Sequence, residues 1–305
     1  MSVIEISGLR KEYRRFRRGT TVAVDGLDLS VPEGGVFGFL GPNGSGKTTT
    51  IRCLLGLVAP SAGSCHLLGA DVRTSLPRVI RQVGAIVETP AFFPSFSGRR
   101  NLQLLGKLNG IGDRAVDEVL ERVGLADRAG DEVKRYSLGM RQRLGLAAVL
   151  LKDPSVLILD EPANGLDPAG IREIRMLLRK LGDEGRTVFV SSHQLGEIQQ
   201  TCDRVAILRA GRCIETGPVH DVLTNGRAAG VLVRVDDMAA ALAVFSAAGI
   251  RTEPADDGFL LVDHPPAAAG HVTELLGRHQ LWVSELRPQE LSLEDVFLEL
   301  TEAAS

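Results

Sequence analysis

The stretch Gly41-Pro-Asn-Gly-Ser-Gly-Lys-Thr48 constrains the fold more than any other part of this 305-residue chain. It fits the pattern G-x-x-x-x-G-K-[ST], in which glycines let successive backbone N–H groups turn inward around phosphate oxygens. The short apolar run Val36–Leu40 precedes it, and Thr48–Val58 has helical spacing and stops before Pro60. A strand, a glycine-rich loop and a helix in this order predict a phosphate-binding loop in an α/β fold.

Lys47 and Thr48 carry the chemistry expected of this loop. The lysine would neutralise the β- and γ-phosphates of a nucleotide, and the threonine hydroxyl would bind Mg²⁺. The alternative is a glycine-rich turn with a chance lysine, and the flanking strand and helix argue against it. The predicted nucleotide-binding residues of the loop are Gly41, Pro42, Asn43, Gly44, Ser45, Gly46, Lys47, Thr48 and Thr49.

A second buried strand, Val156–Leu159, ends in the adjacent carboxylates Asp160 and Glu161. A strand tip directed at the phosphate loop would place Asp160 close to Mg²⁺ and Glu161 beside the attacking water, as a general base. Two solvated acids at a strand end are the alternative, which becomes minor beside a phosphate loop. Asp160 and Thr48 are therefore predicted metal-binding residues, and Glu161 and Lys47 are predicted catalytic residues.

Further helices are predicted between these motifs and beyond them, and the strand Thr187–Val190 follows. Strands that alternate with helices imply a mostly parallel sheet with both faces covered. The fold class is thus α/β. The predicted helices are Pro77–Val83, Arg100–Leu108, Asp113–Val123, Arg141–Leu151 and Ala169–Leu181.

The segment Tyr136–Arg143, YSLGMRQR, leads into one of these helices. Ser137 has the residue type of a helix N-cap, and capping alone would explain it. However, Ser-x-Gly-x-[KR]-Gln-Arg, about twenty residues before the strand Val156–Leu159, resembles the signature loop of ABC-type ATPases. Three other features resemble the same family. Ser192-His193 resembles its switch histidine, and Gly165–Pro168 resembles its D-loop. Tyr13 resembles its aromatic residue that stacks on adenine.

This resemblance covers about residues 3–220 and implies a P-loop NTPase of the ABC cassette type with a small helical subdomain. It implies ATP and Mg²⁺ as cofactors and a head-to-tail, ATP-dependent dimer of two copies. It also implies further site residues: Tyr13, Ser137, Gly139 and Asp167 for ATP, and His193 as a third catalytic residue.

The sequence departs from the family pattern at two places. The signature usually reads Leu-Ser-Gly-Gly-Gln, whereas Tyr136, Leu138 and Met140 replace three of those residues here. The glutamine of the family's Q-loop falls on Glu88, which the resemblance implies as a metal-contacting residue. Together with the tail SLEDVFLELT at 292–301, this glutamate resembles ATPase subunits of bacitracin, lantibiotic and daunorubicin-type exporters. Export of a drug, an antibiotic peptide or a similar amphipathic compound is the implied function.

No apolar run approaches the roughly 20 residues that span a bilayer, and the N-terminus lacks the layout of a signal peptide. The chain is therefore expected in the cytoplasm, peripheral on the inner face of the cell membrane. As a transporter subunit it would need an integral membrane permease and a second copy of itself. A net charge of −3 gives no attraction to nucleic acid, so no such partner is expected.

A soluble ABC ATPase of DNA repair or translation is the alternative function. Repair ATPases carry a long coiled coil between the phosphate loop and the signature, but about ninety residues of ordinary sequence separate Lys47 from Ser137. Translation ATPases usually carry two cassettes, and one is recognised here. A third alternative, a nucleotide-binding regulator without turnover, fits poorly with an intact Glu161.

A change of composition near Asn225–Gly226 predicts a domain boundary. The cassette would occupy residues 1–225, with its helical subdomain at about 85–150, and a small accessory domain would occupy residues 226–305. Strands and helices in the order β-α-β-β-α-β predict that this second domain is ferredoxin-like, followed by a last helix capped by Ser292 and Asp295. The candidate site residues all precede Asn225, so the accessory domain is expected to be dispensable for nucleotide binding.

Overall fold

The computed structural model describes residues 2–15, 19–88, 91–224, 230–265, 268–289 and 292–302. The chain divides into two compact units, residues 1–219 and 220–305. The boundary predicted at Asn225–Gly226 lies outside the described residues.

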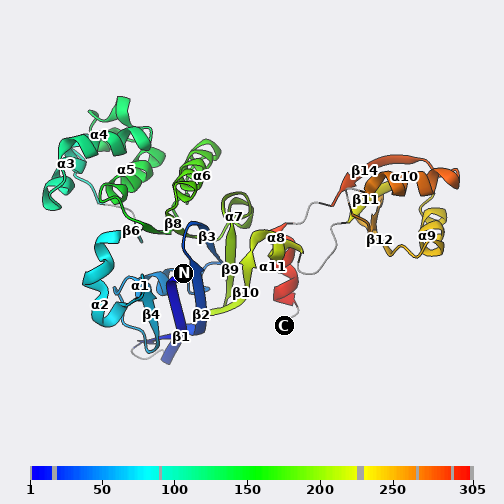
Figure 1. Ribbon diagram of the computed structural model, residues 1–305, viewed down its shortest axis with the longest axis horizontal. Coiled ribbons are helices and arrows are strands. Elements are labelled where there is room, and N and C mark those ends of the chain that lie inside the picture. The colour runs from blue at the N-terminus through cyan, green and yellow to red at the C-terminus, as the bar shows by residue number, and fades with distance from the viewer. Residues whose placement is uncertain are drawn as a thin grey trace. The chain divides into compact units, whose positions relative to one another are not determined.

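A mostly parallel sheet is the centre of the first unit, with the strand order β10-β9-β3-β8-β7-β6 (Figure 1). Strands β3, β7 and β8 are apolar runs buried on both faces, as central strands of a parallel sheet must be. Strand β10 pairs antiparallel with β9, and the other neighbours are parallel. The predicted parallel sheet is confirmed. Its strands are β3 (Gly35–Leu40), β6 (Val83–Ile86), β7 (Val156–Asp160), β8 (Thr187–Ser192), β9 (Arg204–Arg209) and β10 (Arg212–Pro218).

A second, antiparallel sheet has the order β2-β1-β4-β5. One hydrophobic core joins it to the parallel sheet, and helix α1 (Lys47–Leu54) contributes the fully buried Ile51 and Leu54 to this core. Burial of these side chains fixes the helix that follows the phosphate loop. The strands of the second sheet are β1 (Ser2–Arg15), β2 (Gly19–Pro32), β4 (Ala62–Leu67) and β5 (Ala70–Asp71).

Helices α3, α4 and α5 pack on one another and form a separate group in the first unit (Figure 1). Tyr136, just before α5, is buried in this group and donates a hydrogen bond to the carbonyl of Arg128 at 2.7 Å. A Cβ at Gly98 would lie 2.3 Å from the Tyr136 hydroxyl oxygen, so any residue larger than glycine would clash with this hydroxyl. The helices of the first unit after α1 are α2 (Val72–Val79), α3 (Gly98–Leu108), α4 (Asp113–Arg122), α5 (Leu138–Leu150), α6 (Pro168–Asp183) and α7 (Leu195–Thr201); α8 (Val219–Thr224) follows.

The helix predicted over Pro77–Val83 is wrong in its bounds. Helix α2 begins at Val72, because the Asp71 side chain accepts a hydrogen bond from the backbone N–H of Arg73 at 2.7 Å and caps it. The helix ends at Val79, and Val83 already begins strand β6.

Helix α1 also ends earlier than the predicted Val58. Gly56 adopts a φ of +67°, and its N–H donates to the Cys53 carbonyl at 3.0 Å. The N–H of Leu57 donates to the Arg52 carbonyl at 2.9 Å. These two bonds form a Schellman motif, which stops the helix several residues before Pro60.

The second unit has the predicted ferredoxin-like order. Its antiparallel sheet runs β12-β13-β11-β14, and Val233, Phe245 and Leu276 lie in one core between the sheet and its helices. Ser292 caps the last helix as predicted, since its hydroxyl accepts from the N–H of Asp295 at 3.1 Å. The elements are β11 (Val231–Val235), α9 (Met238–Ala247), β12 (Thr252–Ala255), β13 (Phe259–Val262), α10 (Ala269–Arg278), β14 (Val283–Pro288) and α11 (Leu293–Glu302).

Candidate functional site

The phosphate loop lies between β3 and α1, as the sequence predicts. Gly44 and Gly46 adopt φ angles of +83° and +106°, in the left-handed region that favours glycine. A Cβ at Gly46 would lie 2.5 Å from the Ala23 carbonyl oxygen, so the loop is packed tightly against β2. Free N–H groups at the start of α1, together with the helix dipole, favour an anion here.

Lys47 is buried, with 6% of its side chain exposed. Its ammonium donates to the carbonyl oxygens of Gly41 at 2.6 Å and Pro42 at 3.3 Å, and it lies 3.3 Å from Oε1 of Glu161. The loop thus holds a positive charge where the predicted phosphates would bind.

Thr48 and Asp160 meet although they come from different elements. The threonine hydroxyl donates to Oδ2 of Asp160 at 2.7 Å, and the hydroxyl of Ser191 donates to the other carboxylate oxygen. A hydroxyl and a carboxylate supply the oxygen ligands that Mg²⁺ prefers. This donor set therefore fits the predicted metal.

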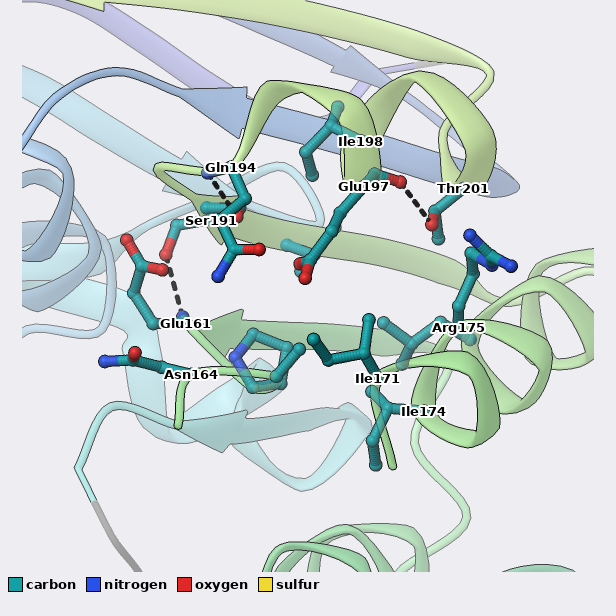
Figure 2. A pocket seen from close by; sticks show the side chains of 15 residues that line it. Glu161, Asn164, Ile171, Ile174, Arg175, Ser191, Gln194, Glu197, Ile198 and Thr201 are labelled. Carbon is teal, nitrogen blue, oxygen red and sulfur yellow. Dashed lines mark hydrogen bonds between the residues drawn. The ribbon is translucent and has the colours of Figure 1, made fainter. Parts of the chain in front are cut away.

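Glu161 follows β7 with a φ of +50°, a conformation that is uncommon outside glycine and clusters at functional sites. Its N–H donates to the Ser191 hydroxyl at 3.0 Å, which supports this conformation (Figure 2). Its carboxylate lies between Lys47 and His193, whose Nδ1 is 2.8 Å from Oε2. The three predicted catalytic residues are thus brought together.

The remaining predicted nucleotide-binding residues make local contacts. Tyr13 lies on β1 under the ammonium of Lys11, 5.0 Å from the ring centroid. Ser137 caps α5, with Gly139 in its first turn, and accepts from the N–H of Met140 at 3.2 Å. Asp167 caps α6 and accepts from the N–H of Gly170 at 3.1 Å. Within one copy of the chain, Ser137 and Asp167 therefore act as helix caps.

Glu88, the predicted metal-contacting residue after β6, makes a different contact. Its Oε1 lies 2.8 Å from Nη2 of Arg52 on α1, and 77% of its side chain is exposed. The structure therefore places Glu88 in an exposed ion pair rather than in contact with Thr48 and Asp160.

The sequence does not predict two residues of this region, Ser191 and Glu197. Ser191 binds both Asp160 and the backbone of Glu161, and only its place on the strand before Ser192-His193 could have indicated it. Glu197 lines a cavity of about 30 Å³ beside Glu161, between β8, α6 and α7. Figure 2 shows its side chain pointing into this cavity.

Burial raises the pKa of Glu197. The neighbouring His193 lowers that pKa, Glu161 raises it and Arg175 of α6 lowers it. Among the described residues, Oε1 of Glu197 has no hydrogen-bond partner. The folded chain therefore holds the proton of this carboxyl more tightly than the unfolded chain does.

We expect Glu197→Gln to stabilise the protein increasingly as the pH rises above about 4.3, until Glu197 is ionised in the folded chain as well. A raised folded-state pKa contributes stability that is present below the unfolded value of about 4.3 and lost as the pH rises through the folded value. Glutamine is neutral throughout and avoids that loss. The difference in melting temperature between variant and wild type, measured across this pH range, should grow with pH. The exposed Glu121→Gln should show a flat difference, and a flat difference for Glu197→Gln would contradict the assignment.

Comparison with known proteins gives the family. The model of the ABC transporter family matches residues 24–164, and residues 229–294 match a domain of unknown function, DUF8746. The uncharacterized ABC transporter ATP-binding protein YhcH of Bacillus subtilis (strain 168) is 44% identical over 302 residues, 98% of this chain and 96% of that protein. This chain belongs to the ABC transporter ATP-binding proteins. It is the ATPase subunit of a transporter, and the alternative of a repair or translation ATPase is set aside.

Other relatives of this ABC ATPase agree with that assignment. The bacitracin transport ATP-binding protein BcrA of Enterococcus faecalis is 37% identical over 300 residues, 98% of this chain and 96% of BcrA. The structure of cbiO1 from Clostridium perfringens, part of the ABC transporter complex cbiONQ, is similar with a TM-score of 0.65 and 28% identity. The superposed residues make up 74% of this chain and 92% of cbiO1. Within the described residues, no helix of the ABC ATPase is long and apolar enough to cross a membrane.

Proposed function

We propose that this ABC ATPase drives export of a drug, an antibiotic peptide or a similar amphipathic compound through a separate integral membrane permease. Its similarity to BcrA along nearly the full length of both chains carries the proposal. The chain would act in the cytoplasm, peripheral on the inner face of the cell membrane, where the permease presents its inner surface.

Glu161 is the proposed general base of hydrolysis. Its carboxylate is held by two groups, Lys47 and Nδ1 of His193, which fix its direction. It accepts a proton from the attacking water, while Lys47 binds the β- and γ-phosphates of ATP. His193 orients the carboxylate and completes the catalytic set.

Thr48 and Asp160 are the residues that would hold Mg²⁺ with the ATP phosphates. When bound, this ion supplies positive charge that stabilises the oxygens of the transferred phosphoryl group. Glu88 would have to leave Arg52 to contact the ion.

A second copy of the chain is the proposed partner in ATP binding. Ser137 is exposed at the N-terminus of α5, where free N–H groups can receive the phosphates of ATP held by the other copy. Gly139 and Asp167 would lie at the same interface, and Tyr13 would stack on adenine. The cassette is proposed to span residues 1–225, and residues 226–305 to be an accessory domain that ATP binding does not need.

Export can be tested in a drug-sensitive bacterium that produces the chain together with the membrane protein encoded beside its gene. We expect the minimum inhibitory concentration of at least one amphipathic compound, from a panel that includes bacitracin and daunorubicin, to rise several-fold. Glu161→Gln at equal protein level is the matched control and should give no protection. Equal protection by both proteins, or none by the wild type against the whole panel, would contradict the proposal.

A further inference from the structure

The turn between β9 and β10 lies against the phosphate loop. Gly211 in this turn donates its N–H to the carbonyl oxygen of Ser45 at 2.9 Å, and its own carbonyl accepts from the N–H of Asp25 on β2 at 2.9 Å. Three segments far apart in the sequence are thus joined at one point: β2, the phosphate loop and the β9–β10 turn.

The carbonyl of Ser45 fixes the direction of a phosphate-binding group. In a trans peptide unit the C=O of one residue and the N–H of the next point in opposite directions within one plane. A carbonyl of Ser45 that is held outward by Gly211 therefore turns the N–H of Gly46 inward, toward the position of the phosphates. Loss of the hydrogen bond between Gly211 and the Ser45 carbonyl would free the peptide plane between Ser45 and Gly46 to rotate.

The contact between turn and loop is too close to admit side chains. A Cβ at Gly211 would lie 3.0 Å from the carbonyl oxygen of Ala23 and 3.0 Å from Cα of Val24. A Cβ at Gly46 would lie 2.5 Å from the same carbonyl and 3.5 Å from Cα of Gly211. Small displacements of the turn are therefore transmitted directly to the loop.

An ion-pair cluster fastens the turn to β2. Both Nε and Nη2 of Arg212 donate to Oδ2 of Asp25, at 3.0 and 2.6 Å, and Arg10 donates to the other oxygen. The hydrogen bond from Arg212 lowers the pKa of Asp25, which keeps the carboxylate ionised. Arg212 comes directly after Gly211, so the cluster holds the residue that binds Ser45.

We propose that Asp25 and Arg212 are positioning residues for ATP: they clamp the β9–β10 turn so that Gly211 keeps the phosphate loop in its nucleotide-binding shape. Neither side chain has to touch the nucleotide. This inference rests on the binding of ATP by the phosphate loop. The ion pair between Asp25 and Arg212 would then support ATP binding, whereas most surface ion pairs have no effect on a binding site.

The test uses the full chain and the variants Arg212→Ala, Asp25→Ala and their combination. We expect each single change to raise the ATP dissociation constant and KM by about 2- to 5-fold, the range an exposed pair can supply, with kcat at saturating ATP unchanged. The combination should weaken binding no more than Asp25→Ala alone, because the two residues act as one pair. Arg212→Lys, which keeps the charge, should restore most of the affinity.

Arg114→Ala is the matched control, since Arg114 forms an exposed pair with Glu118 on α4, at 2.9 Å. It should leave the dissociation constant unchanged. A purely structural role would instead lower the melting temperature and the active fraction, and hence kcat, without moving KM. That result, or unchanged ATP affinity in both single variants, would overturn the proposal.

Two other outcomes are equally decisive. Weaker binding in Arg212→Ala but not in Asp25→Ala would show that Arg212 acts on ATP binding without Asp25, and would overturn the clamp. If the wild-type chain bound no ATP, the proposed function itself would fall. Unchanged variants of a wild type that does bind ATP would refute only the clamp.

Discussion

Replacing Glu161 with glutamine is expected to lower ATP turnover by about 10²- to 10⁴-fold, the usual contribution of a general base. The amide keeps the shape of the carboxylate but cannot accept the proton of the attacking water. ATP binding should persist, because the variant keeps Lys47 and the N–H groups of the loop. Phosphate release under saturating Mg-ATP and the ATP dissociation constant measure the two effects separately.

Glu118→Gln is the matched control, since it makes the same chemical change on the exposed surface of α4 and should leave turnover unchanged. With hydrolysis blocked, Mg-ATP should also convert the Glu161→Gln protein from a monomer to a dimer in sedimentation velocity. Wild-type turnover in the variant would remove Glu161 from the role of base. A monomer with and without Mg-ATP would count against the proposed second copy.

Lys47→Ala should weaken ATP binding by about 10- to 100-fold. Hydrogen bonds to charged groups contribute about 1.5–3 kcal/mol, and each 1.4 kcal/mol is a factor of ten in affinity. The lysine is almost wholly buried and donates a hydrogen bond to the loop that would surround the phosphates. Water therefore cannot make up for the lost interaction between its ammonium and the phosphates. Titration calorimetry with ATP gives the affinity directly.

Lys152→Ala provides the control, because Lys152 is exposed beyond α5. Lys47→Met tests a further point: it keeps the apolar stem and removes the charge, so it should bind ATP as weakly as the alanine variant. Both variants should be compared with wild type by thermal melting, since Lys47 also bonds Gly41 and Pro42. A folded Lys47→Met protein with wild-type affinity would refute the phosphate-binding role.

The phosphate loop and the tip of β7 could be predicted because each is a contiguous pattern whose residue types are tied to one chemistry. Their meeting could be expected too, since parallel strands present their carboxyl ends at the same edge of a sheet. Strands β7 and β3 both border β8, and this arrangement brings Asp160 to Thr48. The resemblance to the family added His193, whose place beside Glu161 no local pattern indicates.

The contacts that could not be predicted depend on register and on the choice of partner. Ser191 reaches Asp160 because the two residues are paired across β8 and β7, and pairing of distant strands leaves no mark in either local sequence. Glu88 pairs with Arg52 on the surface, where a long side chain has many possible partners. Asp25 lies on β2, and its local sequence does not indicate that its partner is Arg212, 187 residues further along the chain.

The approach of Tyr136 to Gly98 limits which substitutions these two positions tolerate. A side chain at position 98 would require the tyrosine ring to leave, and the family's leucine at position 136 would leave the space above Gly98 unfilled. We therefore expect a side chain at position 98 to be tolerated better when position 136 carries a smaller residue than tyrosine. The contact therefore couples the residue before the signature serine to the first residue of α3.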